Sequence, residues 1–172
     1  MLSVGFIGVG KMGRGMCENI IKKGYTTTVY DTDSGALVQF KDGATLASSS
    51  LEVFLDSDVI FLSLPNSDVV ESIVGEFLQE DFTGKTIVDV STSYPESTKA
   101  LHAKCTAEGG QFVDAPLLGS PADTAAGTAP CMISGDREAV DHVWDIISSY
   151  ASPIDNMGPI GSAHTVKIAM NF

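Results

Sequence analysis

The stretch "GFIGVGKMGRGM", residues 5–16, decides the fold. It places Gly8, Gly10 and Gly13 in G-x-G-x-x-G spacing, after an apolar run and at the start of a helical pattern. Gly8 allows a tight turn, Gly10 lets a pyrophosphate approach the backbone, and Gly13 lets the helix pack closely on the strand. The free N–H groups at the start of that helix favour the anion. The stretch therefore predicts a dinucleotide-binding strand, loop and helix.

Short apolar runs alternate with helical patterns along the rest of the chain. Each crossover is long enough for one helix, which favours parallel strands with helices on both faces. The sequence therefore predicts the α/β class, with a Rossmann-type, mostly parallel, doubly wound sheet. The expected strands are residues 2–7, 26–30, 59–64, 86–90, 111–115 and 129–134.

Two of the expected helices are marked by the residues at their ends. Residues 12–23 form a helical pattern that Gly24 ends. Another helix begins near Ser93, because Ser93 and Glu96 have the spacing of a capping box and Pro95 falls in the first turn.

The last part of the chain contains a helix, a loop and a second helix. Asp136 is the expected N-cap of a helix over residues 137–150. Residues 151–163 are rich in proline and glycine, so we expect a loop that separates the α/β unit from a final helix opening at Ser162. The apolar stripe of the first helix, expected in the core, is Val140, Val143, Trp144 and Ile147.

Composition excludes several classes of protein. The 172 residues fit one domain of ordinary size, and 44% of them are hydrophobic. A net charge of −12 argues against a nucleic-acid partner and against a polybasic membrane patch. We find no signal peptide or membrane span and expect a cytoplasmic protein. The three cysteines and three histidines are scattered, so we expect buried reduced thiols and no metal site.

Asp31 stands at the end of the second expected strand, 18 residues after Gly13 (31 − 13). This position suits a carboxylate that accepts hydrogen bonds from the adenosine ribose hydroxyls. It would repel a 2′-phosphate, and "DTDSG" (31–35) offers no lysine or arginine in compensation. We therefore expect NAD in preference to NADP. The alternative interpretation is that Asp31 only caps a turn.

Ordered motifs over essentially the whole chain resemble the 3-hydroxyisobutyrate dehydrogenase, or β-hydroxyacid dehydrogenase, family. The opening signature is "GFIGVGKMGRGMCENI" (5–20), and the match closes with Lys167 and Asn171. Between them stand "LPN" (64–66), "VDVSTSYP" (88–95) and "DAPLLGSPADTAAGT" (114–128).

The resemblance implies an NAD(P)-dependent oxidoreductase whose substrate is a small carboxylic acid, a β-hydroxy acid or its semialdehyde. Family members have a Rossmann domain and an all-helical domain, joined by a long helix that opens with the catalytic lysine. Residues 1–161 would then be the NAD-binding domain and residues 162–172 the start of the interdomain helix, with the helical domain absent. The resemblance further implies a full-length homo-oligomer, and a cofactor-binding portion that is inactive alone.

The resemblance also assigns roles to individual residues. Lys167 and Asn171 would be catalytic. The substrate would lie against Ser91, Leu118, Gly119 and Ser120. The cofactor would be bound by Gly8, Val9, Gly10, Lys11, Met12, Gly13, Asp31, Leu64, Pro65, Asn66 and Thr92.

Lysine suits the chemistry that the resemblance implies. Reduction of an aldehyde needs a hydride and a proton on the carbonyl oxygen, and a lysine ammonium beside that oxygen can donate the proton. In the reverse reaction the neutral amine accepts it. Asn171 would share a helix face with Lys167 and hold the geometry.

Some positions depart from the family pattern. Leu118 replaces a serine of the substrate loop, while the N–H groups of Gly119 and Ser120 are expected to remain available. His164 is expected on the surface of the last helix, the alternative being an accessory residue of the site. Residues 167–172 are expected to be frayed or docked on a neighbouring molecule, because so short a helix is marginal in water.

Alternative functions stay open. An imine reductase would generally replace Lys167, and a 6-phosphogluconate dehydrogenase would carry His-Asn where Met170 and Asn171 stand. A non-catalytic dinucleotide-binding module would tend to lose the lysine.

Overall fold

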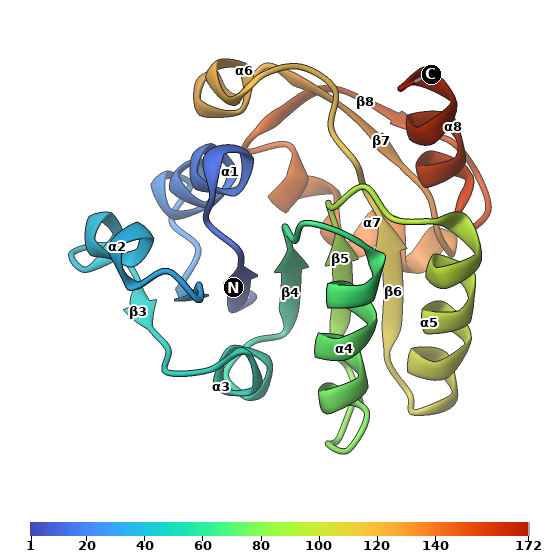
Figure 1. The fold of residues 1–172 in the computed structure, drawn as a ribbon, viewed down its shortest axis with the longest axis horizontal. Coiled ribbons are helices and arrows are strands. Elements are labelled where there is room, and N and C mark those ends of the chain that lie inside the picture. Colours follow the sequence, from blue (N-terminus) through green and yellow to red (C-terminus); the bar gives the residue numbers. More distant parts are fainter. Residues whose placement is uncertain (172) are drawn as a thin grey trace.

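A single parallel sheet organises the chain in the computed structural model, which describes residues 1–171. Its six strands lie in the order β3-β2-β1-β4-β5-β6, and every neighbouring pair is parallel (Figure 1). The predicted α/β, Rossmann-type sheet is therefore confirmed. The strands are β1 (Val4–Ile7), β2 (Thr27–Tyr30), β3 (Thr45–Leu46), β4 (Val59–Leu62), β5 (Thr86–Asp89) and β6 (Gln111–Asp114).

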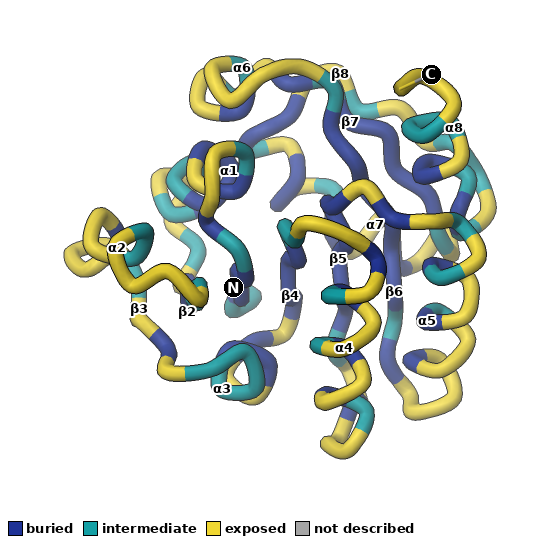
Figure 2. The backbone as a smooth tube through the Cα atoms, viewed as in Figure 1, coloured by how far each residue is buried: buried dark blue, intermediate teal, exposed yellow. Residues whose placement is uncertain are grey.

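Helices cover both faces of this sheet. The helical elements are α1 (Lys11–Lys22), α2 (Ser34–Leu37), the 3₁₀ turn η1 (Val38–Phe40), α3 (Ser50–Leu55), α4 (Ser67–Phe77), α5 (Pro95–Ala107), α6 (Pro121–Ala126), α7 (Arg137–Ile147) and α8 (Ser162–Met170). Side chains of the central strands alternate between two apolar clusters. Phe6 and Phe61 pack with α1 and α7 on one face, and Ile60 and Leu62 pack with α3, α4 and α5 on the other. Figure 2 shows β4, β5 and β6 mostly buried, whereas much of α4 and α5 is exposed.

The structure contains a second, two-stranded sheet. Its first strand was predicted, but its second strand and their pairing were not. β7 (Ala129–Ile133) pairs in parallel with β8 (Ala151–Asn156), so the predicted loop over 151–163 is wrong for its first six residues. β8 contains Pro153 and exposes most of its side chains, which hides the apolar alternation that marks a half-buried strand. Strand β3 was missed because both of its two residues are exposed.

Of two predicted N-caps, one is wrong and one is confirmed. The N-cap of α5 is Tyr94, and the Ser93 hydroxyl donates to Asp89 (2.6 Å), so the Ser93–Glu96 capping box does not form. Asp136 stands at the N-cap of α7 as predicted, but its carboxylate contacts His102 Nε2 (2.9 Å). That helix ends at Ile147, three residues earlier than predicted.

Other predictions about the core hold. Three residues of the α7 stripe are buried and Trp144 packs partly against the core. The three cysteines are free and buried. Burial raises the pKa of the Cys105 thiol to about 12, as expected for inert thiols. Across residues 1–171, we find no helix with the length and apolar content that a bilayer span requires.

Candidate functional site

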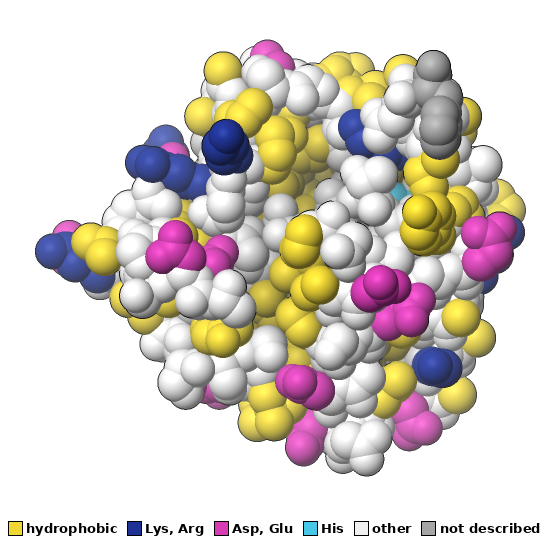
Figure 3. All heavy atoms as spheres, in the orientation of Figure 1, with side chains coloured by type: hydrophobic (Ala, Val, Ile, Leu, Met, Phe, Trp, Pro, Cys, Tyr) yellow, Lys and Arg dark blue, Asp and Glu magenta, His cyan; other side chains and the backbone are white. Residues whose placement is uncertain are grey.

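Three adjoining hollows lie at the carboxyl edge of the large sheet. The first, about 440 Å³, extends from Asp31 to Pro65; the second, about 320 Å³, from the glycine loop to Thr92; the third, about 240 Å³, from Thr92 to Asn171. The first and second share Gly10 and Pro65, and the second and third share Thr92. The surface is hollowed near the centre of Figure 3. A ligand longer than any one hollow can therefore lie across all three.

One further hollow of about 410 Å³ lies beside Gly84 and Gln111, where β5 and β6 begin. It stands at the opposite edge of the sheet, away from the glycine loop. Ligands of open parallel sheets bind at the carboxyl ends of the strands, so we assign the site to the three joined hollows.

The glycine loop has the geometry that a pyrophosphate needs. Gly8 has φ +92°, and a Cβ there would lie 2.1 Å from the Ser63 carbonyl oxygen. A Cβ on Gly13 would lie 2.0 Å from the Gly8 carbonyl oxygen, whereas a Cβ on Gly10 would meet nothing within 4 Å. The first main-chain bond of α1 runs from Arg14 N–H to the Gly10 carbonyl, which leaves the preceding N–H groups for an anion. These residues fit the diphosphate of a dinucleotide.

Asp31 joins the glycine loop to the end of β2. Its Oδ2 accepts the Val9 N–H (2.8 Å) and its Oδ1 accepts the Asp33 N–H (2.8 Å), while the residue also lines the first hollow. A carboxylate has about four acceptor positions, so two remain for ribose hydroxyls. Asp31 thus supports a turn, as the alternative interpretation held, and still faces the site.

Ser91 fixes the loop that follows β4. Its hydroxyl accepts the Leu64 N–H (2.9 Å) and donates to the Leu62 carbonyl (3.2 Å). Asn66 is the N-cap of α4, and its side chain accepts the Val69 N–H (3.1 Å). The predicted Leu64–Asn66 segment is thereby held along the edge of the hollows.

The final helix brings one of its two predicted polar residues into the site. Asn171 lines the third hollow together with Asn66 and Thr92. Lys167 lies one turn earlier and is partly buried, and this loss of solvation lowers the pKa of its ammonium group. Helix α8 is continuous through Met170, so fraying over residues 167–170 is not observed. Phe172, also expected to fray, lies outside the described residues.

The loop predicted to bind substrate is differently arranged. The Ser120 N–H donates to Asp123 Oδ2 (2.7 Å) and the Ser120 hydroxyl donates to the same oxygen (2.6 Å). These hydrogen bonds lower the pKa of Asp123 and keep it anionic. The expectation that the Ser120 N–H is available is therefore wrong. The signal was present in the sequence, because Ser120 and Asp123 have N-cap and N3 spacing. Among the described residues, 118–120 border none of the three hollows.

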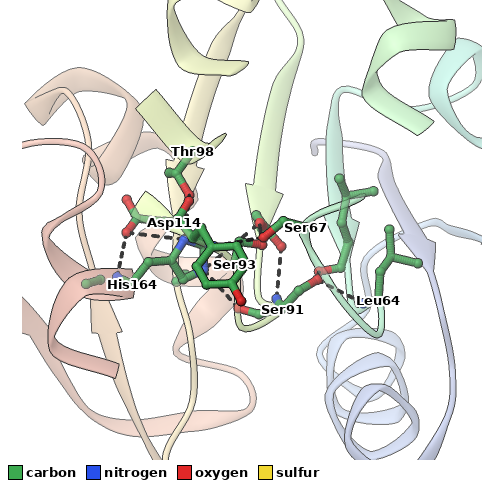
Figure 4. A network of polar contacts seen from close by, with 12 residues as sticks. Leu64, Ser67, Ser91, Ser93, Thr98, Asp114 and His164 are labelled. Atoms are coloured by element: carbon green, nitrogen blue, oxygen red, sulfur yellow. Dashed lines mark hydrogen bonds and ion pairs between the residues drawn. The ribbon is translucent and has the colours of Figure 1, made fainter. Parts of the chain in front are cut away.

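A fully buried polar network next to the site was missed. His164, predicted on the surface, is 0% exposed, as are Asp89 and Asp114. Figure 4 shows the His164 ring between the Ser91 turn and Thr98. The available signal was an aspartate at the carboxyl end of each of two neighbouring strands, in "IVDV" and "FVDA".

The sheet, the glycine loop and the joined hollows define a dinucleotide-binding domain of the Rossmann type. Residues 3–160 match the family described as the NAD binding domain of 6-phosphogluconate dehydrogenase, and the chain belongs to that family. NAD is therefore its cofactor, as predicted.

Curated relatives that the chain resembles include dehydrogenases of hydroxy acids. It is 33% identical to a 2-(hydroxymethyl)glutarate dehydrogenase of Eubacterium barkeri, over 99% of this chain and 58% of the relative. It is 32% identical to an NAD-dependent L-serine dehydrogenase of Pseudomonas aeruginosa, over 99% of this chain and 59% of the relative. The chain thus spans less than two thirds of each of these relatives. The resemblance to the NAD-binding domain of this group is confirmed.

Solved structures agree on the fold. A putative oxidoreductase from Mycobacterium avium 104 superposes with TM-score 0.94 at 29% identity, covering 99% of this chain and 62% of that one. The 3-hydroxyisobutyrate dehydrogenase of Mycobacterium tuberculosis superposes with TM-score 0.94 at 24% identity, covering 99% and 59%.

Proposed function

We propose that the chain is the cofactor-binding portion of an NAD-dependent oxidoreductase that transfers a hydride between nicotinamide and a small β-hydroxy acid or semialdehyde. The observation that carries this proposal is the line of joined hollows that runs from Asp31 past the glycine loop and Thr92 to Asn171. One end holds a carboxylate of the type that binds a ribose, and the other holds Asn171, which lies one turn after Lys167.

The cofactor residues would divide the dinucleotide between them. Asp31 would accept hydrogen bonds from the adenosine ribose, and Thr92 would lie beside the nicotinamide. Leu64, Pro65 and Asn66 would line the path between these ends. The pyrophosphate would lie against the loop residues Gly8, Val9, Gly10, Lys11, Met12 and Gly13.

The preference for NAD over NADP rests on charge. Asp31 borders the first hollow, and no lysine or arginine among the described residues lines it. A 2′-phosphate placed there would face a carboxylate without a compensating cation, which is unfavourable in a partly desolvated site.

The chain's own contribution to the reaction would be made by α8. The bound cofactor would supply the hydride as NADH and accept it as NAD⁺. Lys167 Nζ would donate a proton to the carbonyl oxygen during reduction and accept it back during oxidation. Partial burial lowers the pKa of Lys167, which makes release of that proton easier near neutral pH. Asn171, one turn on, would hydrogen-bond the substrate or the lysine.

The substrate class is supported by the names of the relatives. One is a dehydrogenase of 2-(hydroxymethyl)glutarate and another of L-serine. We propose that a small carboxylic acid contacts Ser91, Leu118, Gly119 and Ser120. Because Asp123 accepts the Ser120 N–H, we assign the donor for the acid to the N–H of Gly119.

Domain organisation and partners follow the same proposal. Residues 1–161 would form the NAD-binding domain, and residues 162–172 would begin a helix leading to an all-helical domain. That domain would complete the cleft and join the subunits of a homo-oligomer. We therefore expect the isolated chain, a cytoplasmic protein by this proposal, to bind NAD without turning over substrate.

Replacing Lys167 by methionine in a full-length version tests the mechanism. Lys167→Met should leave the Kd for NADH unchanged and lower the rate of semialdehyde reduction by roughly 10²–10⁴-fold. Lys104→Met, on the exposed side of α5, is the matched control and should change neither. A full reaction rate in Lys167→Met would remove the lysine from the mechanism. It would favour a relative with other chemistry, or a binding module.

A further inference from the structure

The start of α8 is attached to the turn that follows β5 by a buried side chain. His164 Nε2 lies 2.8 Å from the carbonyl oxygen of Ser91. A carbonyl oxygen only accepts hydrogen bonds, so Nε2 carries the proton in this contact. His164 Nδ1 lies 2.8 Å from the hydroxyl of Thr98 on α5. The ring therefore joins α8, the β5–α5 turn and α5 (Figure 4).

The main chain of α8 is held at the same place. Asp114 Oδ1 accepts the Gly161 N–H (2.9 Å), and Asp114 Oδ2 accepts the His164 N–H (2.9 Å). The Ser134 hydroxyl accepts the Ala163 N–H (2.9 Å) and donates to Asp114 Oδ1 (2.5 Å). The first N–H groups of the helix thus have buried acceptors, which fixes where α8 begins.

The turn on the other side of the ring is equally constrained. Asp89 accepts the Ser91 N–H (2.9 Å) and the Ser93 hydroxyl (2.6 Å). The ring lies between the two carboxylates, with Nε2 4.0 Å from Asp89 Oδ2 and Nδ1 3.7 Å from Asp114 Oδ2. All three side chains are fully buried, so water cannot replace a lost contact.

This attachment joins two segments that border the candidate site. Thr92, next to Ser91, borders the second and third hollows, and Asn171, which directly follows α8, borders the third. Lys167 is three residues after His164. We propose that His164 is a positioning residue that sets the place of α8 relative to the Thr92 turn. On the proposed function, it thereby fixes Lys167 and Asn171 relative to the nicotinamide. Binding of NAD beside the Thr92 turn would then also order α8.

Three variants separate this role from simple packing. His164→Leu keeps an apolar side chain in the buried position of the ring but removes the N–H that the Ser91 carbonyl oxygen accepts. His164→Gln keeps an N–H donor at similar reach and an oxygen for Thr98. Thr98→Val leaves His164 in place, keeps the shape of residue 98 and removes the partner of Nδ1. Each is compared with the parent chain by amide NMR during titration with NAD⁺, and by hydrogen exchange of the α8 amides.

In the parent chain NAD⁺ should shift the amides of Gly10 and Thr92 and also those of residues 165–171. In His164→Leu the Gly10 shift should persist while the α8 response disappears, and exchange of the α8 amides should speed up by about tenfold, the scale of one lost buried hydrogen bond. His164→Gln should restore the α8 response.

An α8 response that persists unchanged in His164→Leu would overturn the inference, as would a His164→Gln variant that behaves like His164→Leu. If His164→Leu does not fold, Thr98→Val decides: a weakened α8 response supports the inference, and an unchanged one overturns it. If NAD⁺ shifts neither the Gly10 nor the Asp31 amide of the parent chain, the proposed function itself fails, which is a different result from a missing α8 response.

Discussion

The carboxylate of Asp31 accepts the main-chain N–H of Val9 at 2.8 Å, which links the end of β2 to the loop after β1. The same side chain borders the first hollow. On the proposed function, one residue therefore shapes the loop that would hold the pyrophosphate and would offer acceptors to the ribose. Asp31→Asn keeps one oxygen acceptor but loses the charge. We expect it to weaken NADH binding by about 10-fold to 100-fold, the range for a hydrogen bond to a charged group.

Asp33→Asn is the matched control for that titration. Asp33 stands two residues on, and its side chain accepts the Gly35 N–H at the start of α2 and is not among those that line the first hollow. Its substitution should leave the Kd for NADH unchanged. Equal loss of affinity in both variants would mean that Asp31 acts only through the turn.

Substitutions at two glycines of the loop should have different effects, one on NADH binding and the other on the stability of the fold. Because nothing lies within 4 Å of a Cβ on Gly10, Gly10→Ala should fold with a cost below about 1 kcal/mol and still lose NADH affinity, since the methyl group occupies the path of the pyrophosphate. Gly13→Ala brings a Cβ 2.0 Å from the Gly8 carbonyl oxygen and should unfold at lower denaturant concentration. Urea titrations and NADH titrations of both variants test this. A Gly10→Ala protein that binds NADH normally would contradict the assignment of the loop.

Asn19 connects α1 to α6. Its amide donates to the carbonyls of Gly15 (3.0 Å), Thr124 (2.8 Å) and Ala125 (3.2 Å). Asn19→Ala leaves these acceptors without their donor, and we expect a loss of about 1–3 kcal/mol in the free energy of unfolding. Glu18→Ala, which removes only an exposed contact to Arg14, should change it by less than about 0.5 kcal/mol. Similar thermal midpoints for the two variants would refute the connection.

Asp58 gives the fold an acid-sensitive contact. The Ser3 N–H and hydroxyl both donate to Asp58 Oδ2 at 2.8 Å, and these bonds lower the pKa of the carboxyl group. A carboxyl pKa that is lower in the folded state adds stability above the unfolded value near 3.8, and this stability is lost as pH falls through the folded pKa. Asp58→Asn should therefore be less stable at pH 7 and lose less stability on acidification. Asp56→Asn serves as the control, because the Asp56 carboxylate makes no hydrogen bond within residues 1–171.

Lys167 should make stability depend on pH in the alkaline range. Partial burial lowers its pKa, so between the folded value and the ordinary 10.5 the unfolded chain binds more protons than the folded one. Stability then rises with pH across that interval. Lys167→Met should remove this rise, as measured by urea unfolding at several pH values. A parent chain whose stability shows no such rise would mean that Lys167 is more solvated than the structure shows.

The sheet could be predicted because its signals are local. Strands such as 59–64 are continuous apolar runs, and the glycine spacing at Gly8–Gly13 identifies the first turn without any tertiary information. β8 could not be predicted in this way, because its exposed side chains and Pro153 give it the composition of a loop.

The site was predictable only in part for a related reason. The location of Asp31 in the site could be predicted because it directly follows one strand, β2. His164 is buried beside Asp89 and Asp114. These residues end β5 and β6 and meet the α8 histidine only in the folded chain. A single histidine in a helical pattern gives no indication of such partners. The loss of the Ser120 N–H to Asp123 is different, since that spacing was visible and was not interpreted.

The central claim, that the cleft beside Asp31 binds NAD, is tested most directly by titrating the chain with NADH and NADPH under identical conditions and following fluorescence transfer. We predict that NADH binds at least about tenfold more tightly, since each tenfold corresponds to about 1.4 kcal/mol and a phosphate beside an uncompensated carboxylate costs at least this much. Equal or tighter binding of NADPH would contradict the account.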